Sequence, residues 1–233
     1  MSEDKLYKFV RKDEDSMILE SLIRENNEEH STNYPTSVFD PSHVTECPRR
    51  MIYRANGCVS EKNISYSLIH NRMFIKKKWL DFLESCRSIK VIDRNVVTAD
   101  CHYNISGKAD AVLKIGDRVY VSQIHPVSHD EFVQLKKNGA FKKHVVELIL
   151  YIWLTELKDG LLLYENQNTN DHMIFHVKQY EPIIRSVRKK CLKLMEDKIH
   201  GIVPPKPYES IDSNECVSCE FTKICWQEKK ENA

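Results

Sequence analysis

The stretch that most constrains the fold is residues 107–125, in which apolar and polar side chains alternate on either side of Gly116 and Asp117. Alternation places every second residue on the same face of a strand, and a Gly-Asp pair between two such runs favours a two-residue hairpin turn. The apolar positions of the two strands are Ala111, Leu113, Ile115, Val119 and Val121. We therefore expect a β-hairpin around which the rest of the chain is organised.

Three polar side chains interrupt this apolar hairpin. Asp110 lies at the start of the first strand, and Gln123 and His125 close the second. Because Gln123 and His125 are two residues apart, they point to the same face of the sheet. A buried polar group is costly unless it is paired or binds a ligand. The pattern indicates either a metal or phosphate site or an exposed strand end with solvated side chains.

The remaining segments alternate between helical and strand patterns. Apolar spacing predicts short helices that start near Ser42 and at Cys47-Pro48, and longer ones over 61–86, 141–158 and 181–199. Strands are expected at 89–92, 96–105, 161–164 and 173–177, and 126–140 reads as a loop with a short helical piece. Helices and strands thus share one α/β chain.

Length and charge set the outer bounds. A chain of 233 residues, 41% of them hydrophobic, is enough for one domain with a core. The net charge of +1 carries no global nucleic-acid signal, so such binding depends on local basic patches. No apolar run can span a membrane and no signal core is present, so we expect an intracellular protein, cytoplasmic or nucleoid-associated. Residues 1–35 read as a polar arm with a short helix near 15–24, and 228–233 as a polar tail.

Eight cysteines in an intracellular chain indicate a metal or a cluster rather than disulfides. Three of them, Cys216, Cys219 and Cys225, form a C-x2-C-x5-C pattern near the C-terminus. The first two can bind one metal centre from a single turn, and Cys225 can add a third thiolate. A fourth ligand must come from elsewhere. Zinc and a [4Fe–4S] cluster both accept four cysteines, so the spacing leaves both open.

Two motifs carry a resemblance to known nucleases. Gly107-Lys-Ala-Asp110 followed by a strand is similar to the signature of PD-(D/E)XK nucleases. Cys47-Pro48-Arg49-Arg50, together with the C-terminal cysteines, resembles RecB-like nucleases of the CRISPR-associated exonuclease and AddB types. The resemblance covers about residues 37–227. It implies a nuclease domain over 36–227 with a restriction-endonuclease-like fold, a central mixed β-sheet flanked by helices.

The resemblance also implies an iron–sulfur site. In those nucleases a cysteine near the N-terminus and three near the C-terminus bind one [4Fe–4S] cluster, which joins the two ends of the domain. Carried over to this chain, the implied ligands are Cys47, Cys216, Cys219 and Cys225. Zinc is the alternative occupant.

The catalytic centre departs from the family pattern. There, an Asp and a Glu hold Mg²⁺ or Mn²⁺ and a Lys acts on the attacking water, but this chain has Gln123 and His125 in place of Glu and Lys. A helical His fits an additional metal ligand, and Glu147 and Tyr151 occupy a Gln-x-x-x-Tyr motif. The resemblance thus implies the catalytic candidates Asp110, Gln123, His125, Glu147 and Tyr151, and the metal ligands His70, Asp110 and Gln123.

Two readings of this centre remain open. In one, the active site is lost, and the fold is retained for DNA binding or for assembly with protein partners. In the other the site is rearranged: Glu147 supplies the missing carboxylate, and Lys142 or Lys143 the positive charge. We then expect a metal-dependent DNA nuclease, with full or attenuated activity, that acts as an exonuclease on single-stranded or end-containing DNA. The basic residues expected to bind DNA are Arg49, Arg50, Lys76, Lys77, Lys142 and Lys143.

A third hypothesis involves no nucleic acid at all. The cysteine pattern would then hold zinc and stabilise a protein-interaction module. Zinc in place of iron and acid-labile sulfide, together with no affinity for DNA, would distinguish this module from a nuclease.

Overall fold

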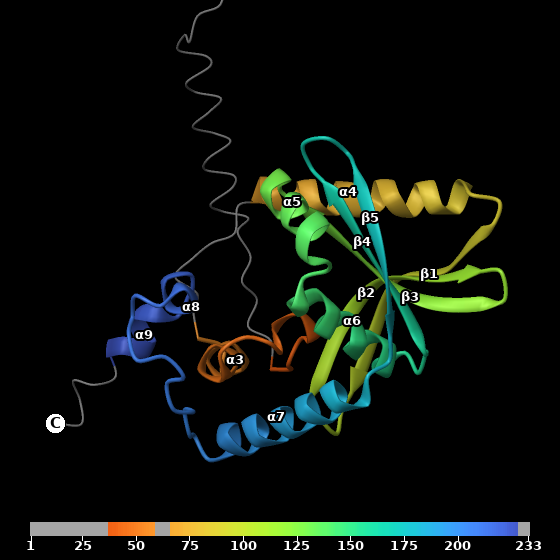
Figure 1. Ribbon diagram of the computed structural model, residues 1–233. Helices are drawn as coiled ribbons and strands as arrows, with labels where there is room; N and C mark the ends of the chain where they lie inside the picture. The colour runs from red at the N-terminus through yellow and green to blue at the C-terminus, as the bar shows by residue number, and fades with distance from the viewer. Residues whose placement is uncertain (1–36, 59–65, 228–233) are drawn as a thin grey trace, which may run out of the picture.

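The computed structural model describes residues 37–58 and 66–227 (Figure 1). The expected polar arm with its helix near 15–24 and the polar tail lie outside the described residues. Five strands form one sheet in the order β1-β2-β3-β4-β5. Their bounds are β1 (Ile89–Asp100), β2 (Ile105–Ile115), β3 (Arg118–Val127), β4 (Asp159–Asn166) and β5 (His172–Lys178).

The sheet is mixed, as expected. Strands β1, β2 and β3 are successively antiparallel, β3 and β4 are parallel, and β4 and β5 are antiparallel. A parallel pair needs a long crossover connection, which α5 (His129–Asn138) and α6 (Lys142–Leu154) provide. Ser128 and Glu131 start α5 with a capping box, in which each side chain accepts the backbone N–H of the other residue.

Helices cover both faces of the sheet (Figure 1). Helix α4 (Tyr66–Ser85) packs on one face, α6 packs on the other, and α7 (Glu181–Ile199) lies against α6 and α3 (Pro48–Ala55). The layer between α4 and the sheet is built from Ile75, Trp79, Leu80, Leu83, Ala111, Leu113, Ile124 and Leu163. The layer between the sheet and α6 includes Ala109, Val121, Leu148, Ile152 and Leu162. The polar residues of the hairpin therefore lie within a three-layer core.

The predicted hairpin is present and its end defines the site. Gly116 takes the positive φ of 59° that the two-residue turn requires. Strands β2 and β3 pair from Ile115 and Arg118 as far as Ala111 and Ser122. Beyond that pair the strands part, because β2 continues along β1 while β3 continues along β4.

Several predicted boundaries differ from the observed ones. The strands expected at 89–92 and 96–105 are one strand, β1, with a bulge between Val91 and Asp93, followed by a turn in which Asn104 has a φ of 49°. The loop expected over 126–140 contains the full helix α5. The helix expected over 141–158 ends at Leu154, and Gly160 lies within β4. A side chain at Gly160 would come within 2.9 Å of Leu148, so close packing on α6 explains this glycine.

The segments at the two ends of the described chain meet beside the sheet. Asp40, rather than Ser42, caps the short 3-10 helix η2 (Pro41–His43), and the preceding Phe39 bridges to Ile105 at the start of β2. Helices α8 (Asn214–Val217) and α9 (Thr222–Gln227) lie next to α3 (Figure 1). Among the described helices none has the length and apolar character that a membrane span requires.

Candidate active site

Asp110 and Gln123 fill the place where β2 and β3 part. The Asp110 Oδ2 accepts a hydrogen bond of 2.7 Å from the backbone N–H of Ile124. Ile124 lies beyond Ser122, where the pairing of β3 with β2 ends. Gln123 is 2% exposed, and its Nε2 lies 3.4 Å from the carbonyl oxygen of Lys108. The carboxylate and the amide thus replace backbone pairing that the separating strands no longer make.

Helix α4 brings a cation to Asp110. The Nζ atom of Lys76 lies 2.8 Å from Oδ1 and 3.0 Å from Oδ2 of that carboxylate. The adjacent Ile75 is buried against the sheet, which fixes the rotation of the helix. This ion pair was not anticipated, because the sequence pattern assigns Lys76 to a DNA-binding surface.

Helix α6 brings a second buried carboxyl. Glu147 is 8% exposed, and its carboxyl makes no hydrogen bond or ion pair among the described residues. Burial and the nearby charges of Asp40 and Asp110 raise the pKa of Glu147 from 4.5 to about 8, although Lys76 and Lys143 act in the opposite direction. In the metal-free protein this carboxyl is therefore largely protonated at pH 7.

The glycine of the Gly-x-x-Asp motif has a steric explanation. A Cβ atom at Gly107 would lie 2.6 Å from Cδ of Pro41 and 2.7 Å from the hydroxyl of Tyr151. The Tyr151 hydroxyl in turn accepts the backbone N–H of Lys108, and burial raises its pKa above the usual value. The close contact places Asp40, the residue before Pro41, beside α6, where it acts on Glu147. Sequence reasoning missed Asp40, since nothing local marks it beyond its position before a proline.

His125 stands where the resembled nucleases have a lysine, and it pairs with His144. The ring of His125 stacks on that of His144 from α6, with centroids 3.7 Å apart and planes within 7°. His144 Nδ1 lies 3.1 Å from the Tyr164 hydroxyl, and the buried His125 Nε2 has no hydrogen-bond partner in the part of the chain that the structure describes. Burial, together with neighbouring cationic groups, lowers the pKa of His144 to about 4 and that of His125 well below 6.5. Both rings are therefore neutral at pH 7. His144 was missed, although it lies three residues before Glu147 on the same helix.

Other predicted residues are exposed on α4 and α6. His70 is exposed on α4, six residues before Lys76. Lys142 and Lys143 are exposed at the start of α6. Lys77 is exposed and pairs with Asp81 on its own helix. Within residues 37–58 and 66–227, no group of three or more His, Cys, Asp or Glu side chains is close enough to hold a metal ion.

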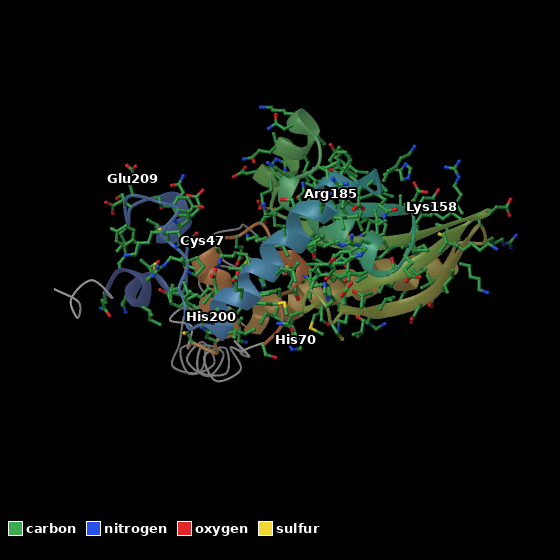
Figure 2. The ribbon with its side chains drawn as sticks, turned by 90° about the horizontal axis from the view of Figure 1, so that it is seen from below. Cys47, His70, Lys158, Arg185, His200 and Glu209 are labelled. Atoms are coloured by element: carbon green, nitrogen blue, oxygen red, sulfur yellow. The ribbon has the colours of Figure 1, made fainter. Side chains whose placement is uncertain are left out.

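The four predicted cluster cysteines share one cavity. Cys47, at the start of α3, and the three C-terminal cysteines line a cavity of about 350 Å³. Figure 2 shows Cys47 at the end of the molecule that α8 and α9 form, opposite Lys158. Arg49 Nε donates to Cys225 Sγ over 3.1 Å, and Phe221 N–H donates to Cys219 Sγ over 3.4 Å. All eight cysteines are free of disulfides.

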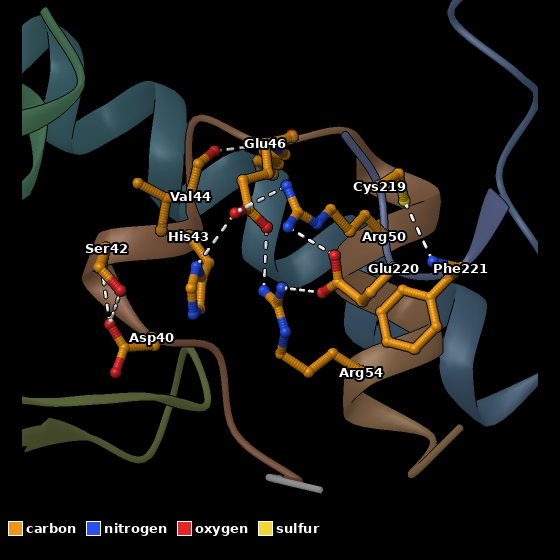
Figure 3. Close-up of polar contacts among 11 residues, drawn as sticks. Asp40, Ser42, His43, Val44, Glu46, Arg50, Arg54, Cys219, Glu220 and Phe221 are labelled. Carbon is orange, nitrogen blue, oxygen red and sulfur yellow. Dashed lines mark hydrogen bonds and ion pairs between the residues drawn. The ribbon is translucent and has the colours of Figure 1, made fainter. Parts of the chain in front are cut away.

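An ion-pair network joins the same two segments independently of the cysteines (Figure 3). Arg50 and Arg54 of α3 both bind Glu220 from the C-terminal segment and Glu46 from the chain before α3. Although burial opposes ionisation, His43 and the two arginines lower the pKa of Glu46 to about 2.

Arg49 is likewise committed to internal contacts. It is 7% exposed and donates to the Pro204 carbonyl and the Tyr53 hydroxyl as well as to Cys225. Arg49 and Arg50 therefore connect protein segments here, in contrast to the exposed lysines of α4 and α6.

Comparison with known proteins finds no matching family and no similar curated protein sequence. Similar solved structures exist. The crystal structure of SSO0001 shares 20% identity with a TM-score of 0.52, over 89% of this chain and 96% of its own. An alkaline exonuclease from Laribacter hongkongensis shares 9% identity with a TM-score of 0.56, over 72% of this chain and 90% of its own. A phage-related exonuclease from Haemophilus somnus shares 9% identity with a TM-score of 0.51, over 70% and 95%. The chain therefore has the restriction-endonuclease-like α/β fold of these exonucleases, as predicted.

Proposed function

We propose that this protein is a divalent-metal-dependent DNA nuclease that acts as an exonuclease on single-stranded or end-containing DNA, with a rearranged active site. The observation that carries the proposal is the buried Glu147 carboxyl, which has no partner among the described residues and lies within electrostatic reach of Asp110. A buried carboxyl left unpaired is costly unless it serves a ligand. The nuclease fold of the structural neighbours supports the same assignment, although a fold alone does not establish an activity.

The donor atoms are of the type that a hard cation binds, although as they stand the described residues form no group that could hold a metal ion. Mg²⁺ and Mn²⁺ prefer carboxylate oxygens, and Asp110, Glu147 and Asp40 offer them, whereas Gln123 contributes a neutral amide oxygen. When bound, such a cation polarises the phosphate and activates water. Asp110 is held in place by the Ile124 N–H, and Glu147 would release its proton to solvent in order to act as a ligand. In hydrolysis the water oxygen bonds to phosphorus as the bond to one ester oxygen breaks; the water loses a proton to solvent, and the departing oxygen gains one.

The test is cleavage by anaerobically purified protein, with Mg²⁺ or Mn²⁺, of single-stranded, blunt and closed circular DNA. Asp110→Asn and Glu147→Gln should each abolish cleavage while the protein stays folded, and closed circles should be resistant. Asn is chosen because its amide oxygen can still accept the Ile124 N–H. Cleavage that survives both substitutions would come from a contaminant or from another site.

A catalytically inactive DNA-binding protein is the second candidate. The observation in its favour is that Gln123 is turned to the Lys108 carbonyl and His125 is packed against His144. Neutral groups therefore occupy the two positions at which the resembled nucleases have Glu and Lys. In this case the wild type binds DNA without cleaving it. The double substitution Gln123→Glu/His125→Lys would then create metal-dependent cleavage, since it restores the charged ligand and the cation.

We also propose that Cys47, Cys216, Cys219 and Cys225 hold a [4Fe–4S] cluster. Four thiols line one cavity and N–H groups donate to two of the sulfur atoms, which supports the proposal, although as they stand the thiols form no metal-binding group among the described residues. The cluster would join α3 to the C-terminal segment. Cys47→Ser should lose iron and acid-labile sulfide and lower the melting temperature, whereas Cys101→Ser, at an exposed cysteine, should do neither. Zinc in the purified protein would favour the zinc-stabilised module instead.

The domain limits and the DNA contacts follow from the same proposal. Residues 36–227 form the nuclease domain, and DNA passes the exposed lysines Lys77, Lys142 and Lys143, beside Lys76. Their contacts go to phosphates, so binding is tolerant of sequence.

A further inference from the structure

The active site lacks a cation at the position where the family places one. The Glu-x-Lys strand of those nucleases has Gln123 and His125 here, and an imidazole has neither the fixed charge nor the reach of a lysine. The His125 ring is held flat against His144, so its position is determined by packing on α6. A phosphate that binds beside Asp110 would therefore have no positively charged side chain from β3 near it.

Helix α4 places a lysine at that point instead. Lys76 Nζ contacts both carboxylate oxygens of Asp110, at 2.8 Å and 3.0 Å, while the Ile124 N–H holds the same carboxylate from the strand side. The Lys76 side chain is 34% exposed and that of Asp110 is 9% exposed. The ammonium group is therefore more accessible to solvent than the buried carboxylate that it contacts.

The packing of α4 selects this lysine from three consecutive ones. Ile75 and Trp79 are buried against the sheet, which sets the rotation of the helix. Lys77 then points to solvent, with a side chain 72% exposed. Lys78 pairs with Glu165 of β4, away from Asp110. Among these lysines the contact with Asp110 belongs to Lys76.

We propose that Lys76 supplies, from helix α4, the catalytic positive charge that strand β3 lacks at position 125. In the metal-free protein its ammonium neutralises Asp110. During the reaction it stabilises the negative charge that develops on the phosphate oxygens, the role that a preorganised cation has in phosphoryl chemistry. This inference rests on the proposed nuclease function and assigns Lys76, in place of Lys142 or Lys143, as its cation.

The test measures kcat, KM for DNA and Kd for Mn²⁺ in wild type, Lys76→Ala and Lys78→Ala. Lys78 is the matched control, because it lies on the same helix as Lys76 and also pairs with a buried carboxylate. Lys76→Ala should lower kcat by about 100-fold or more, as loss of a transition-state charge does. It should bind Mn²⁺ at least as tightly as wild type, since the ammonium no longer competes for Asp110. Lys78→Ala should keep the kcat of wild type.

A rescue variant separates catalysis from structure. Lys76→Ala/His125→Lys returns a lysine to the family position and should regain at least a tenth of the lost kcat. Three results overturn the inference: a kcat of Lys76→Ala within threefold of wild type, loss of Mn²⁺ binding in that variant, or no recovery in the double variant. Absence of cleavage by wild type is a different outcome, since it removes the proposed nuclease function itself.

Discussion

At the scale of single residues, the site is unusual in the protonation of its buried groups. The Glu147 carboxyl and the two stacked imidazoles are all driven by burial toward their neutral forms. The charged pair is Lys76 with Asp110, one from a helix and one from a strand. A cation that binds here must therefore displace a proton from Glu147 and an ammonium from Asp110.

The protonated state of Glu147 makes the stability of the metal-free protein depend on pH. Its pKa rises from 4.5 in the unfolded chain to about 8 in the folded one, so the folded state binds more protons between these values. The free energy of unfolding should therefore fall as pH rises from about 4.5 to about 8. In Glu147→Gln this contribution disappears and the variant should gain stability relative to wild type at pH 8. Urea unfolding in EDTA at several pH values measures both.

The control for this experiment is Glu209→Gln, at an exposed glutamate. Its pH profile should run parallel to that of wild type. A Glu147→Gln profile that also runs parallel to wild type would show that Glu147 is ionised in the folded protein.

The residues of the candidate site that interrupt a local sequence pattern were predictable. Asp110 and Gln123 stand out because they interrupt an apolar hairpin, and the structure places both where β2 and β3 part. The contact of Lys76 with Asp110 joins positions 34 residues apart, and the effect of Asp40 on Glu147 spans a longer separation still. Tertiary packing determines both, so no local spacing reports them.

At the scale of elements, the hairpin and α7 follow directly from sequence, since a Gly-Asp turn and sustained helical periodicity are strong local signals. The predicted element boundaries are wrong where tertiary packing, rather than local sequence, determines the structure. Gly160 resembles a helix terminator but lies in β4, because only a glycine there lets the strand lie against Leu148. The capping box at Ser128 and Glu131 was readable and shows why 126–140 contains a helix.

The docking of the C-terminal segment on α3 should depend on Glu220. Glu220 binds Arg50 and Arg54 and is 8% exposed, so Glu220→Gln leaves two partly buried arginines with a weaker acceptor. We expect a loss of about 1–3 kcal/mol in this contact and faster hydrogen exchange in residues 214–227. Exchange measured by mass spectrometry tests this. Glu215→Gln, at an exposed residue of α8, is the control, and equal exchange in the two variants would contradict a role for the network.

At the scale of the whole molecule, the fold has two candidate sites. Asp110 and its polar contacts lie where β2 and β3 part, and four cysteines line a cavity that α3 and the C-terminal segment share. Figure 1 shows α8 and α9 next to α3. Lys143 lines the cysteine cavity and also acts on Glu147, so the start of α6 lies between the two sites. The net charge of +1 does not reveal this arrangement, because the basic residues are balanced elsewhere in the chain.

Binding of DNA should therefore be electrostatic and local. The logarithm of the binding constant for single-stranded DNA should fall linearly with the logarithm of salt concentration, with a slope of about 0.7 per phosphate neutralised. Lys142→Ala/Lys143→Ala should reduce that slope by about 1.4, since two phosphate contacts are lost, whereas Lys178→Ala, on the edge strand β5, should not change it. Fluorescence anisotropy at several KCl concentrations gives the slopes. An affinity that does not change with salt would exclude phosphate contacts.

The hydrogen bond between Asp110 and the Ile124 N–H has a consequence for how related sequences should be compared. This aspartate has a structural role as well as being a candidate ligand, because its carboxylate accepts a backbone N–H of the neighbouring strand. A lineage that had lost catalysis would still be under selection for stability to retain it. Its presence in a homologue is therefore weak evidence of activity. Glu147 makes no structural bond among the described residues, and a lineage released from catalysis would be free to replace it. Retention of a carboxylate at position 147, more than at 110, would distinguish working enzymes from their inactive descendants.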